Sequence, residues 1–229
     1  MHRASLEDPE SFWLERAARL DWHRPPTRAM ELREDGIASW FPDGRLNTAW
    51  LCLDAHVAAG HGDRTALIHD SPATGRVRRI SYADLTDRGA RMAGALRALG
   101  VERGDRVIVY LPMVPEAAIA MLACARLGAI HSVVFGGFAA RELALRIDDV
   151  RPKVLLTASC GIEFDRVIPY KPLVDDAMEQ AEAPPDACVV LQRPQAEASM
   201  IVGRDHDWQQ LEAGSEPVDA IPVAATDPL

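Results

Sequence analysis

From residue 106 onward, short apolar runs alternate with amphipathic stretches, and this alternation is the most regular pattern in the chain. We expect strands over 106–110, 130–135, 153–158 and 187–191, and helices over 115–127, 139–150 and 172–181. Apolar, β-branched strands between amphipathic helices are typical of a parallel sheet that is buried on both faces. The crossover connections are expected to be right-handed.

A hairpin and a long helix are expected before this region. An apolar run over 65–69 is followed by turn-forming residues and by a returning run over 77–80. Ser81 precedes Asp84 by three residues, a spacing that predicts the N-terminal cap of a helix. Gly100 is expected to end that helix.

The first 60 residues show no alternation typical of strands. Asp8 and the proline after it predict a helix that runs to about residue 20. The stretch 21–44 is rich in Pro, Arg and Trp without a period and is interpreted as an ordered surface loop. A second helix is expected over 48–59. We therefore interpret 1–60 as a mostly helical N-terminal cap.

Residues 61–229 are expected to form an α/β unit. Its pattern fades after residue 193, with one or two helical turns over 205–211. Four aromatic side chains of the first segment are expected to pack beneath the cap: Trp13, Trp22, Trp40 and Trp50.

Composition excludes several classes of protein. The 229 residues are 48% hydrophobic and 26% charged, which argues against a disordered chain. The 25 basic and 34 acidic residues give a net charge of −9, unlike a nucleic-acid binder. The longest apolar stretch, 117–125, is too short to cross a membrane, and acidic residues near the start are unlike a signal peptide. We expect a cytoplasmic protein without a nucleic-acid or membrane partner.

No metal or catalytic motif is present. Cys52, Cys124, Cys160 and Cys188 are too far apart for a zinc site, and we expect buried free thiols. Phosphate-loop, nucleophile-elbow and zinc-protease strings are absent from the sequence. His131 is expected to be a core or hydrogen-bonded histidine, and His206 to lie in a solvated turn. Glu116 is expected to interact with the dipole of its own helix.

Two segments are candidates for ligand binding. Gly136 and Gly137 lie between a strand and a helix, where ligands of open α/β sheets bind. Their alternative role is a tight structural turn. In the loop 160–166, Arg166 is the one cation, with Lys171 shortly after it, and its guanidinium is suited to gripping a phosphate. The alternative is a salt bridge from Arg166 to an acid of the same loop.

The stretches 111–116 and 123–138 resemble the AMP-forming short-chain acyl-CoA synthetases of the adenylate-forming superfamily. Segments 158–163 and 203–207 are more similar to the propionate–CoA ligase branch than to the acetate branch. The resemblance covers the chain from about Pro9 to its end. It implies the first part of the large N-terminal domain of these enzymes.

The resemblance also implies an activity for the whole enzyme. Such ligases join ATP and a short-chain carboxylate into an acyl-adenylate and then transfer the acyl group to coenzyme A, with Mg²⁺ expected. The family's phosphate loop would follow Leu229. We therefore expect no catalytic residue in this chain and no activity from the chain alone. An unpaired sheet edge is expected to favour self-association.

Site residues follow from the same resemblance. The loop that matches Glu163, Phe164, Asp165 and Arg166 lies against the nucleotide end of coenzyme A in the family. The glycines that match Gly136 and Gly137 lie near the pantetheine path. Arg166 matches an arginine that contacts a phosphate. Two acids beside it repel a phosphate, so Arg166 has more negative charge to offset here.

Two other hypotheses stay open. A non-catalytic module derived from a truncated ligase would bind coenzyme A or a partner protein. An in-frame, lysine-containing phosphate loop after codon 229 would favour the ligase. A dinucleotide-binding domain suits the alternation of strands and helices, but it lacks the glycine fingerprint.

Overall fold

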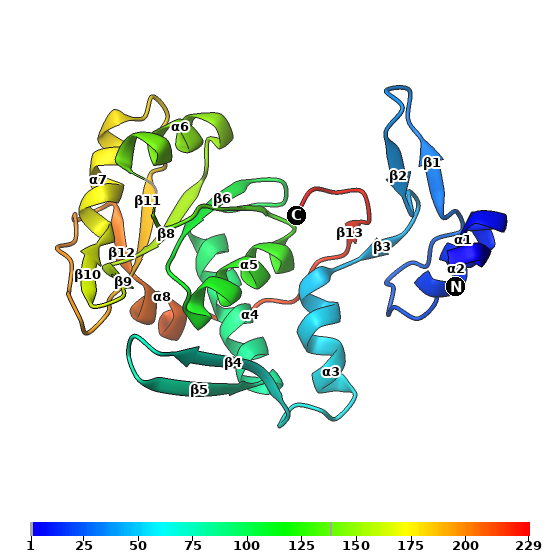
Figure 1. Ribbon diagram of the computed structural model, residues 1–229, viewed down its shortest axis with the longest axis horizontal. Coiled ribbons are helices and arrows are strands. Elements are labelled where there is room, and N and C mark those ends of the chain that lie inside the picture. The colour runs from blue at the N-terminus through cyan, green and yellow to red at the C-terminus, as the bar shows by residue number, and fades with distance from the viewer. Residues whose placement is uncertain (1, 138) are drawn as a thin grey trace.

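A five-stranded sheet forms the centre of the described chain. The computed structural model describes residues 2–137 and 139–229. Every neighbouring pair of strands in this sheet is parallel, as predicted. In spatial order the strands are β12 (Asp205–Asp207), β11 (Ala187–Leu191), β8 (Val154–Ala158), β6 (Arg106–Tyr110) and β7 (Ile130–Val133) (Figure 1).

Helices cover both faces of the sheet, and successive residues of a strand face opposite layers. In β6, Val107 packs with the layer formed by α4 (Tyr82–Ala98) and α5 (Pro115–Leu127). Ile108 packs with the layer formed by α6 (Ala140–Val150) and α7 (Tyr170–Gln180). Because side chains alternate along a strand, an apolar strand in this position fills two separate cores. The predicted α/β class is confirmed.

The expected helix boundaries have local causes. The Asp84 N–H donates to the Ser81 hydroxyl over 3.1 Å at the start of α4. Gly128 ends α5 with φ of 66°, a backbone angle that glycine adopts without strain. The predicted hairpin is also present, because β4 (Thr65–Ser71) pairs antiparallel with β5 (Arg76–Ser81). This hairpin lies beside α4 (Figure 1).

The N-terminal segment contains strands that the sequence pattern missed. It begins with α1 (His2–Glu7) and α2 (Pro9–Ala17), and Asp8 caps α2 as predicted. The stretch 21–44 is not a simple loop, because β1 (Met30–Leu32) pairs with β2 (Ala38–Trp40). Strands of three residues are too short to show an alternation. The helix expected over 48–59 is present as a wide turn, η1 (Trp50–Asp54), and α3 (Ala55–Ala58).

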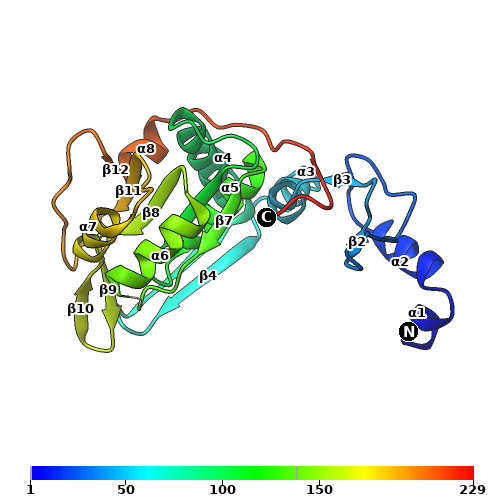
Figure 2. The ribbon, with the colours of Figure 1, turned by 90° about the horizontal axis from the view of Figure 1, so that it is seen from above.

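The tryptophans of this segment are less buried than expected. Trp13, Trp40 and Trp50 keep 38%, 42% and 38% of their surface exposed. Trp13 and Trp40 make an edge-to-face contact at 5.5 Å between ring centroids. The packing is thus between the aromatic rings of a segment that extends away from the sheet (Figures 1 and 2).

A few polar contacts attach this segment to the sheet and its helices. β3 (Arg45–Leu46) pairs antiparallel with β13 (Val223–Ala224). The buried Asn47 amide donates to the backbone oxygens of Ala125 and Ile221, over 2.8 and 2.7 Å. Segments far apart in sequence are therefore joined through one side chain.

The last third of the chain also differs from expectation. The loop after β8 is a hairpin of β9 (Cys160–Glu163) and β10 (Arg166–Pro169). His206 is not in a solvated turn, because it lies in β12 beside Val189 of β11. The chain then forms α8 (Trp208–Gly214), whose Trp208 is fully buried.

Two further observations concern membranes and thiols. No helix among the described residues has the length and apolar character that crossing a bilayer requires. Cys124, Cys160 and Cys188 are buried free thiols as expected, whereas Cys52 is exposed. Burial raises the pKa of the Cys124 and Cys188 thiols to about 12.

Candidate functional site at the carboxyl edge of the sheet

A cavity of about 400 Å³ lies where the central strands end. We call it the edge cavity. The segments after β6 and β7 form part of its wall, and Glu163 of β9 lines it together with Gly136 and Gly137. The structure thus brings together three of the residues predicted from two separate segments. This position matches the rule that ligands of open α/β sheets bind at the carboxyl ends of strands.

Tyr170 explains two glycines beside this cavity. A Cβ atom on Gly136 would lie 2.2 Å from the Tyr170 hydroxyl oxygen, and one on Gly161 would lie 2.4 Å from its ring. The Tyr110 hydroxyl donates to the Gly136 carbonyl over 3.1 Å. Burial raises the pKa of Tyr110 to about 12, so its phenol stays protonated at neutral pH. Glycine at position 136 is therefore required by packing, which supports the structural role for this member of the pair.

Gly137 has a more open environment. The nearest atoms to a Cβ there belong to the Phe135 ring, at 2.6 Å, which is the far end of a side chain. Phe135 and Met113 also line the cavity and are 73% and 92% exposed. Phe138, the next residue in the chain, lies outside the described residues. Backbone and apolar side chains therefore form this side of the cavity, a surface suited to an uncharged, flexible chain.

The β9–β10 hairpin separates the four residues that were predicted to act together. Glu163 lines the edge cavity, whereas Phe164, Asp165 and Arg166 are not among its lining residues. Phe164 is 97% exposed at the tip of the hairpin, with φ of 55°. Asp165 and Arg166 are exposed as well. Of the four residues predicted to act together, Glu163 thus lines the cavity, and residues 164–166 form the exposed tip of the hairpin.

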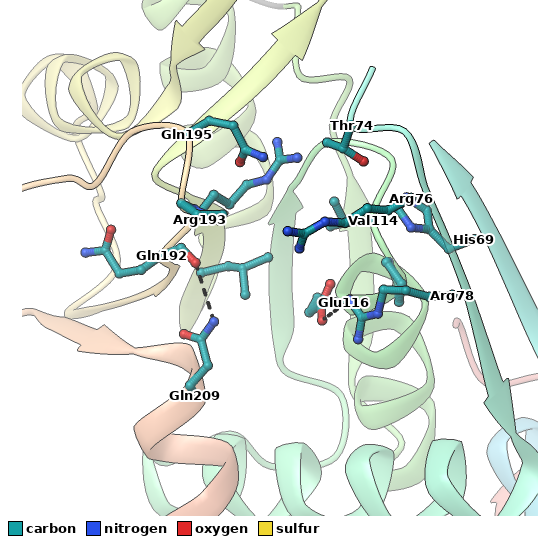
Figure 3. A pocket seen from close by; sticks show the side chains of 13 residues that line it. His69, Thr74, Arg76, Arg78, Val114, Glu116, Gln192, Arg193, Gln195 and Gln209 are labelled. Atoms are coloured by element: carbon teal, nitrogen blue, oxygen red, sulfur yellow. Dashed lines mark hydrogen bonds and ion pairs between the residues drawn. The ribbon is translucent and has the colours of Figure 1, made fainter. Parts of the chain in front are cut away.

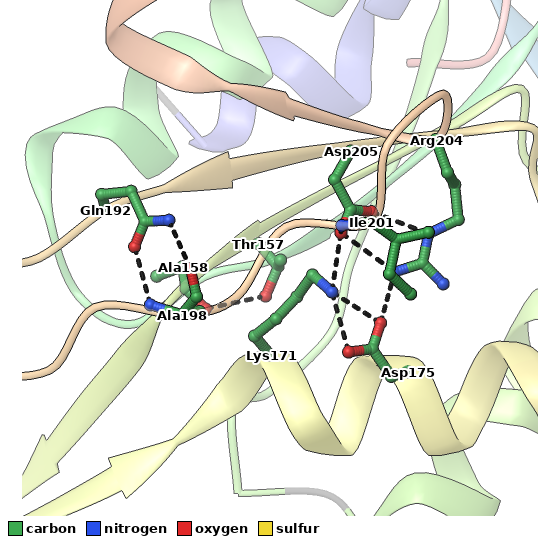
Figure 4. Close-up of polar contacts among 9 residues, drawn as sticks. All are labelled: Thr157, Ala158, Lys171, Asp175, Gln192, Ala198, Ile201, Arg204 and Asp205. Carbon is green, nitrogen blue, oxygen red and sulfur yellow. Dashed lines mark hydrogen bonds and ion pairs between the residues drawn. The ribbon is translucent and has the colours of Figure 1, made fainter.

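Arg166 does not form the alternative salt bridge. Its backbone pairs with Glu163 across the hairpin, but no ion pair joins its guanidinium to a carboxylate in the described part of the chain. Lys171, the other cation near this loop, is 1% exposed and bonds to Asp175 and Asp205 (Figure 4). Arg166 remains available to a ligand, and Lys171 does not.

Arg193 is a site residue that the sequence reasoning missed. It is the one Arg or Lys among the described residues that line the edge cavity. Its Nη1 donates to the Cys160 carbonyl over 2.8 Å, which fixes the guanidinium beside β9. The same side chain lines a second hollow of about 200 Å³ (Figure 3). No local motif marks Arg193, since its position depends on the pairing of β11 with β8.

His131 and Glu116, two other residues considered in the sequence analysis, have surroundings that indicate structural roles. His131 on β7 is only partly buried, which differs from a core position, and its burial lowers the pKa of the imidazole. Glu116 lies in the first turn of α5 as expected, but its carboxylate also bonds to Arg88 over 3.1 Å. Across residues 2–137 and 139–229, no cluster of three or more His, Cys, Asp or Glu side chains is arranged to hold a metal ion.

A protein of known structure matches nearly the whole length of this chain. Acetoacetyl-CoA synthetase from Streptomyces lividans has a solved structure that matches with a TM-score of 0.85 and 28% sequence identity. The match covers 97% of this chain and 34% of that chain. An uncharacterised protein of Pseudomonas aeruginosa is 60% identical over 228 residues, which is 100% of this chain and 36% of that protein.

Two relatives with assigned names are synthetases. The mitochondrial acyl-CoA synthetase short-chain family member 3 of Rattus norvegicus is 44% identical over 99% of this chain and 33% of its own length. The acetyl-coenzyme A synthetase of Streptomyces avermitilis is 47% identical over 90% of this chain and 31% of its own length. The chain therefore spans about a third of the length of these curated relatives.

Two family models match adjoining parts of the sequence. Residues 1–52 match the acetyl-coenzyme A synthetase N-terminus, and residues 54–229 match the AMP-binding enzyme model. The second match covers more than half of the chain and includes the whole central sheet. The chain therefore belongs to the family of AMP-binding enzymes.

Proposed function

We propose that this chain is the N-terminal part of an AMP-forming ligase that converts a short-chain carboxylate into its coenzyme A thioester. The carboxylate, propionate first and acetate second, reacts with the Mg²⁺ complex of ATP to give an acyl-adenylate and pyrophosphate. The thiol of coenzyme A then displaces AMP. The proposal is supported by the family match and by relatives that are short-chain acyl-CoA and acetyl-CoA synthetases.

The edge cavity is the observation that carries the role of this chain. Gly136, Gly137 and Glu163 line one cavity although they come from two segments. A ligand with a long uncharged arm and a phosphorylated end suits a mostly apolar cavity beside a hairpin tip that carries a free guanidinium. We assign the arm of coenzyme A to the two glycines and its nucleotide end to the hairpin.

Arg166 is the proposed phosphate contact, with Phe164 as an exposed aromatic surface beside it. The acids Glu163 and Asp165 flank it and weaken the attraction for a phosphate. A charge-assisted hydrogen bond to a phosphate is about twice as strong as a neutral one. The single guanidinium is therefore expected to account for a measurable share of coenzyme A affinity.

This assignment is tested in the intact ligase. Arg166→Ala is expected to raise the KM for coenzyme A about tenfold, the effect of losing one charge-assisted bond. Carboxylate-dependent ATP–pyrophosphate exchange is expected to remain within about twofold of wild type. Arg97→Ala is a matched control, because Arg97 is exposed in the last turn of α4. An unchanged KM for coenzyme A overturns the hairpin assignment.

The isolated 229-residue polypeptide is expected to form no acyl-adenylate. Its two lysines, Lys153 and Lys171, lie outside any glycine-rich phosphate loop, and Lys171 is buried in ion pairs. The measurement is exchange of radiolabelled pyrophosphate into ATP with propionate or acetate, using the intact ligase as the positive control. Exchange by the purified polypeptide contradicts this part of the proposal.

Substrate choice and domain division are parts of the same proposal. Propionate is expected to give a higher kcat/KM than acetate in the intact ligase, and a preference for acetate overturns that choice. We also propose that 1–60 form a cap and 61–229 the first α/β unit of the AMP-binding domain. Limited proteolysis is then expected to cut the polypeptide near residue 60 before it cuts within the sheet. We place the ligase in the cytoplasm.

A further inference from the structure

Three arginines converge on the hollow of about 200 Å³ beside the edge cavity (Figure 3). We call it the arginine hollow. Arg76 and Arg78 reach it from β5, and Arg193 reaches it from the segment after β11. The first turn of α5 also lines it, through Pro115 and Glu116. Two cationic elements that are distant in sequence therefore face each other across one small space.

The alternation of β5 explains why two of these arginines point the same way. Residues two apart lie on one face of a strand, so Arg76 and Arg78 share a face and Arg79 belongs to the other. Arg79 does not line the hollow. It lines a surface depression beside Asp84 and Asp87, which Arg78 lines as well. Arg79 is therefore an arginine of the same strand that does not line the hollow.

The one carboxylate of the hollow is already neutralised. Glu116 has a side chain only 8% exposed, and its Oε1 lies 3.1 Å from Nη2 of Arg88 and 3.6 Å from Nη1 of Arg78. Arg88 also binds Glu212, with 2.6 Å between Nε and Oε1. The negative charge of Glu116 is therefore taken up by Arg88 and Arg78, and it does not neutralise the positive charges of Arg76 and Arg193.

Among the described residues, no carboxylate oxygen lies within 4.0 Å of a guanidinium nitrogen of Arg76 or Arg193, so neither arginine forms an ion pair. Other arginines near the sheet do, among them Arg103, Arg126 and Arg204, in a chain with more acids than bases. An anion held between these two guanidinium groups offsets their mutual repulsion. Planar guanidinium groups bind phosphate oxygens through paired N–H donors.

Uncharged polar side chains and the start of a helix also surround the hollow. Thr74 and Gln209 line it, with the Thr74 hydroxyl donating to the Ser71 carbonyl over 3.5 Å and the Gln209 amide to the Gln192 carbonyl over 3.4 Å (Figure 3). The N-terminal end of the 13-residue helix α5 carries the positive end of the helix dipole. The surroundings thus favour a small, strongly charged oxyanion over a neutral ligand.

We propose that the arginine hollow binds a phosphate group, with Arg76 and Arg193 as its two charged contacts. The group is supplied either by free phosphate or by a nucleotide whose phosphate reaches the hollow. The proposal does not rest on the assignment of Arg166 to coenzyme A, because Arg166 is not among the residues that line this hollow. It adds a second anion site on the carboxyl side of the sheet.

The test titrates the 229-residue chain with inorganic phosphate by calorimetry, at an ionic strength held constant with sodium chloride. We expect saturable binding by the wild type. Arg76→Gln and Arg193→Gln are each expected to weaken it about tenfold, the effect of one charge-assisted bond. Arg79→Gln on the same strand is the matched control and is expected to change the affinity less than twofold.

Arg76→Gln keeps the proposal falsifiable if Arg193→Gln disturbs folding through its bond to Cys160. The absence of saturable phosphate binding by the wild type overturns the site, and so does an equal loss in Arg79→Gln. Titrations with AMP and coenzyme A separate the sources, since only a ligand seated in the hollow loses affinity in Arg76→Gln. A loss confined to Arg166→Gln overturns this site and leaves the coenzyme A assignment standing.

Discussion

The ammonium group of Lys171 lies 2.8 Å from Oδ2 of Asp205, and the two side chains are 2% and 0% exposed. Asp175 accepts a second bond from Lys171, over 2.7 Å, and Arg204 binds both acids (Figure 4). These contacts connect α7 to the edge strand β12. A buried charge is tolerated only while its partners are present.

Lys171→Met is therefore expected to destabilise the chain strongly. Removing one partner of a buried ion pair leaves the other charge uncompensated, which costs about 3–5 kcal/mol. Urea unfolding followed by circular dichroism measures this loss. Arg3→Met is the control, because the Arg3–Glu7 pair is exposed and is expected to contribute less than about 1 kcal/mol. Equal losses in the two variants contradict a structural role for the buried cluster.

Asp205 predicts a specific acid dependence of stability. Burial by itself raises its pKa, but hydrogen bonds from Arg204, the Ile201 N–H and Lys171 outweigh burial and hold the pKa below its ordinary value. A lowered folded-state pKa stabilises the fold above the ordinary value of about 3.9. That contribution is lost as the pH falls through the lowered pKa.

The acid dependence is measured as the urea midpoint between about pH 5 and pH 2. In the wild type the midpoint is expected to fall below about pH 4. Asp205→Asn is expected to start from a lower stability at pH 5 and to show a shallower decline. An identical acid profile for the two proteins excludes Asp205 as a contributor.

Two glycines of α4 are expected to respond to alanine in opposite ways. A Cβ on Gly94 would lie 2.0 Å from the Glu216 carbonyl oxygen, and backbone there has little freedom to move. Gly94→Ala is expected to cost about 1–3 kcal/mol through overpacking. Gly89→Ala has its nearest contact at 3.8 Å and is expected to stabilise the helix by about 0.5–1 kcal/mol. The melting temperatures of both variants test these expectations. A higher melting temperature for Gly94→Ala contradicts the close approach of the Glu216 carbonyl to α4.

Asn47→Ala is expected to loosen the N-terminal segment. Its amide donates to the carbonyls of Ala125 and Ile221, and its Oδ1 accepts from the N–H of Ala49. The Ala125 carbonyl keeps the Gly128 N–H, but the Ile221 carbonyl and the Ala49 N–H lose the partner described here, which costs about 1–3 kcal/mol. Hydrogen exchange of 1–46 is expected to accelerate in this variant and to stay near wild type in Thr48→Ala. The same exchange rates in both variants contradict the role assigned to Asn47.

The central elements were accessible from sequence because their signals are local. The strand over 106–110, the helix over 115–127 and the strand over 187–191 have the predicted bounds. Each is a uniform apolar or amphipathic run between Gly or Pro and charged residues. The hairpins β1–β2 and β9–β10 were missed, because strands of three or four residues owe their conformation to the partner strand rather than to a period.

The candidate site shows the same division. Gly136 and Gly137 were identifiable, because a glycine pair between a strand and a helix is a local signal. The surroundings of the two glycines differ, since Tyr170 fills the space beside Gly136 and the Phe135 ring lies beside Gly137. Arg193 carried no local signal, and only the register of the sheet brings it to both cavities.

The sequence by itself determined the alternation of strands and helices, the cap at Ser81, and the resemblance to acyl-CoA synthetases. These follow from short-range patterns of burial and backbone preference along the chain. Only the tertiary structure decided that Lys171 is withdrawn into ion pairs and that Arg76 faces Arg193. Contacts between segments distant in sequence depend on strand order and side-chain packing, which no local pattern encodes.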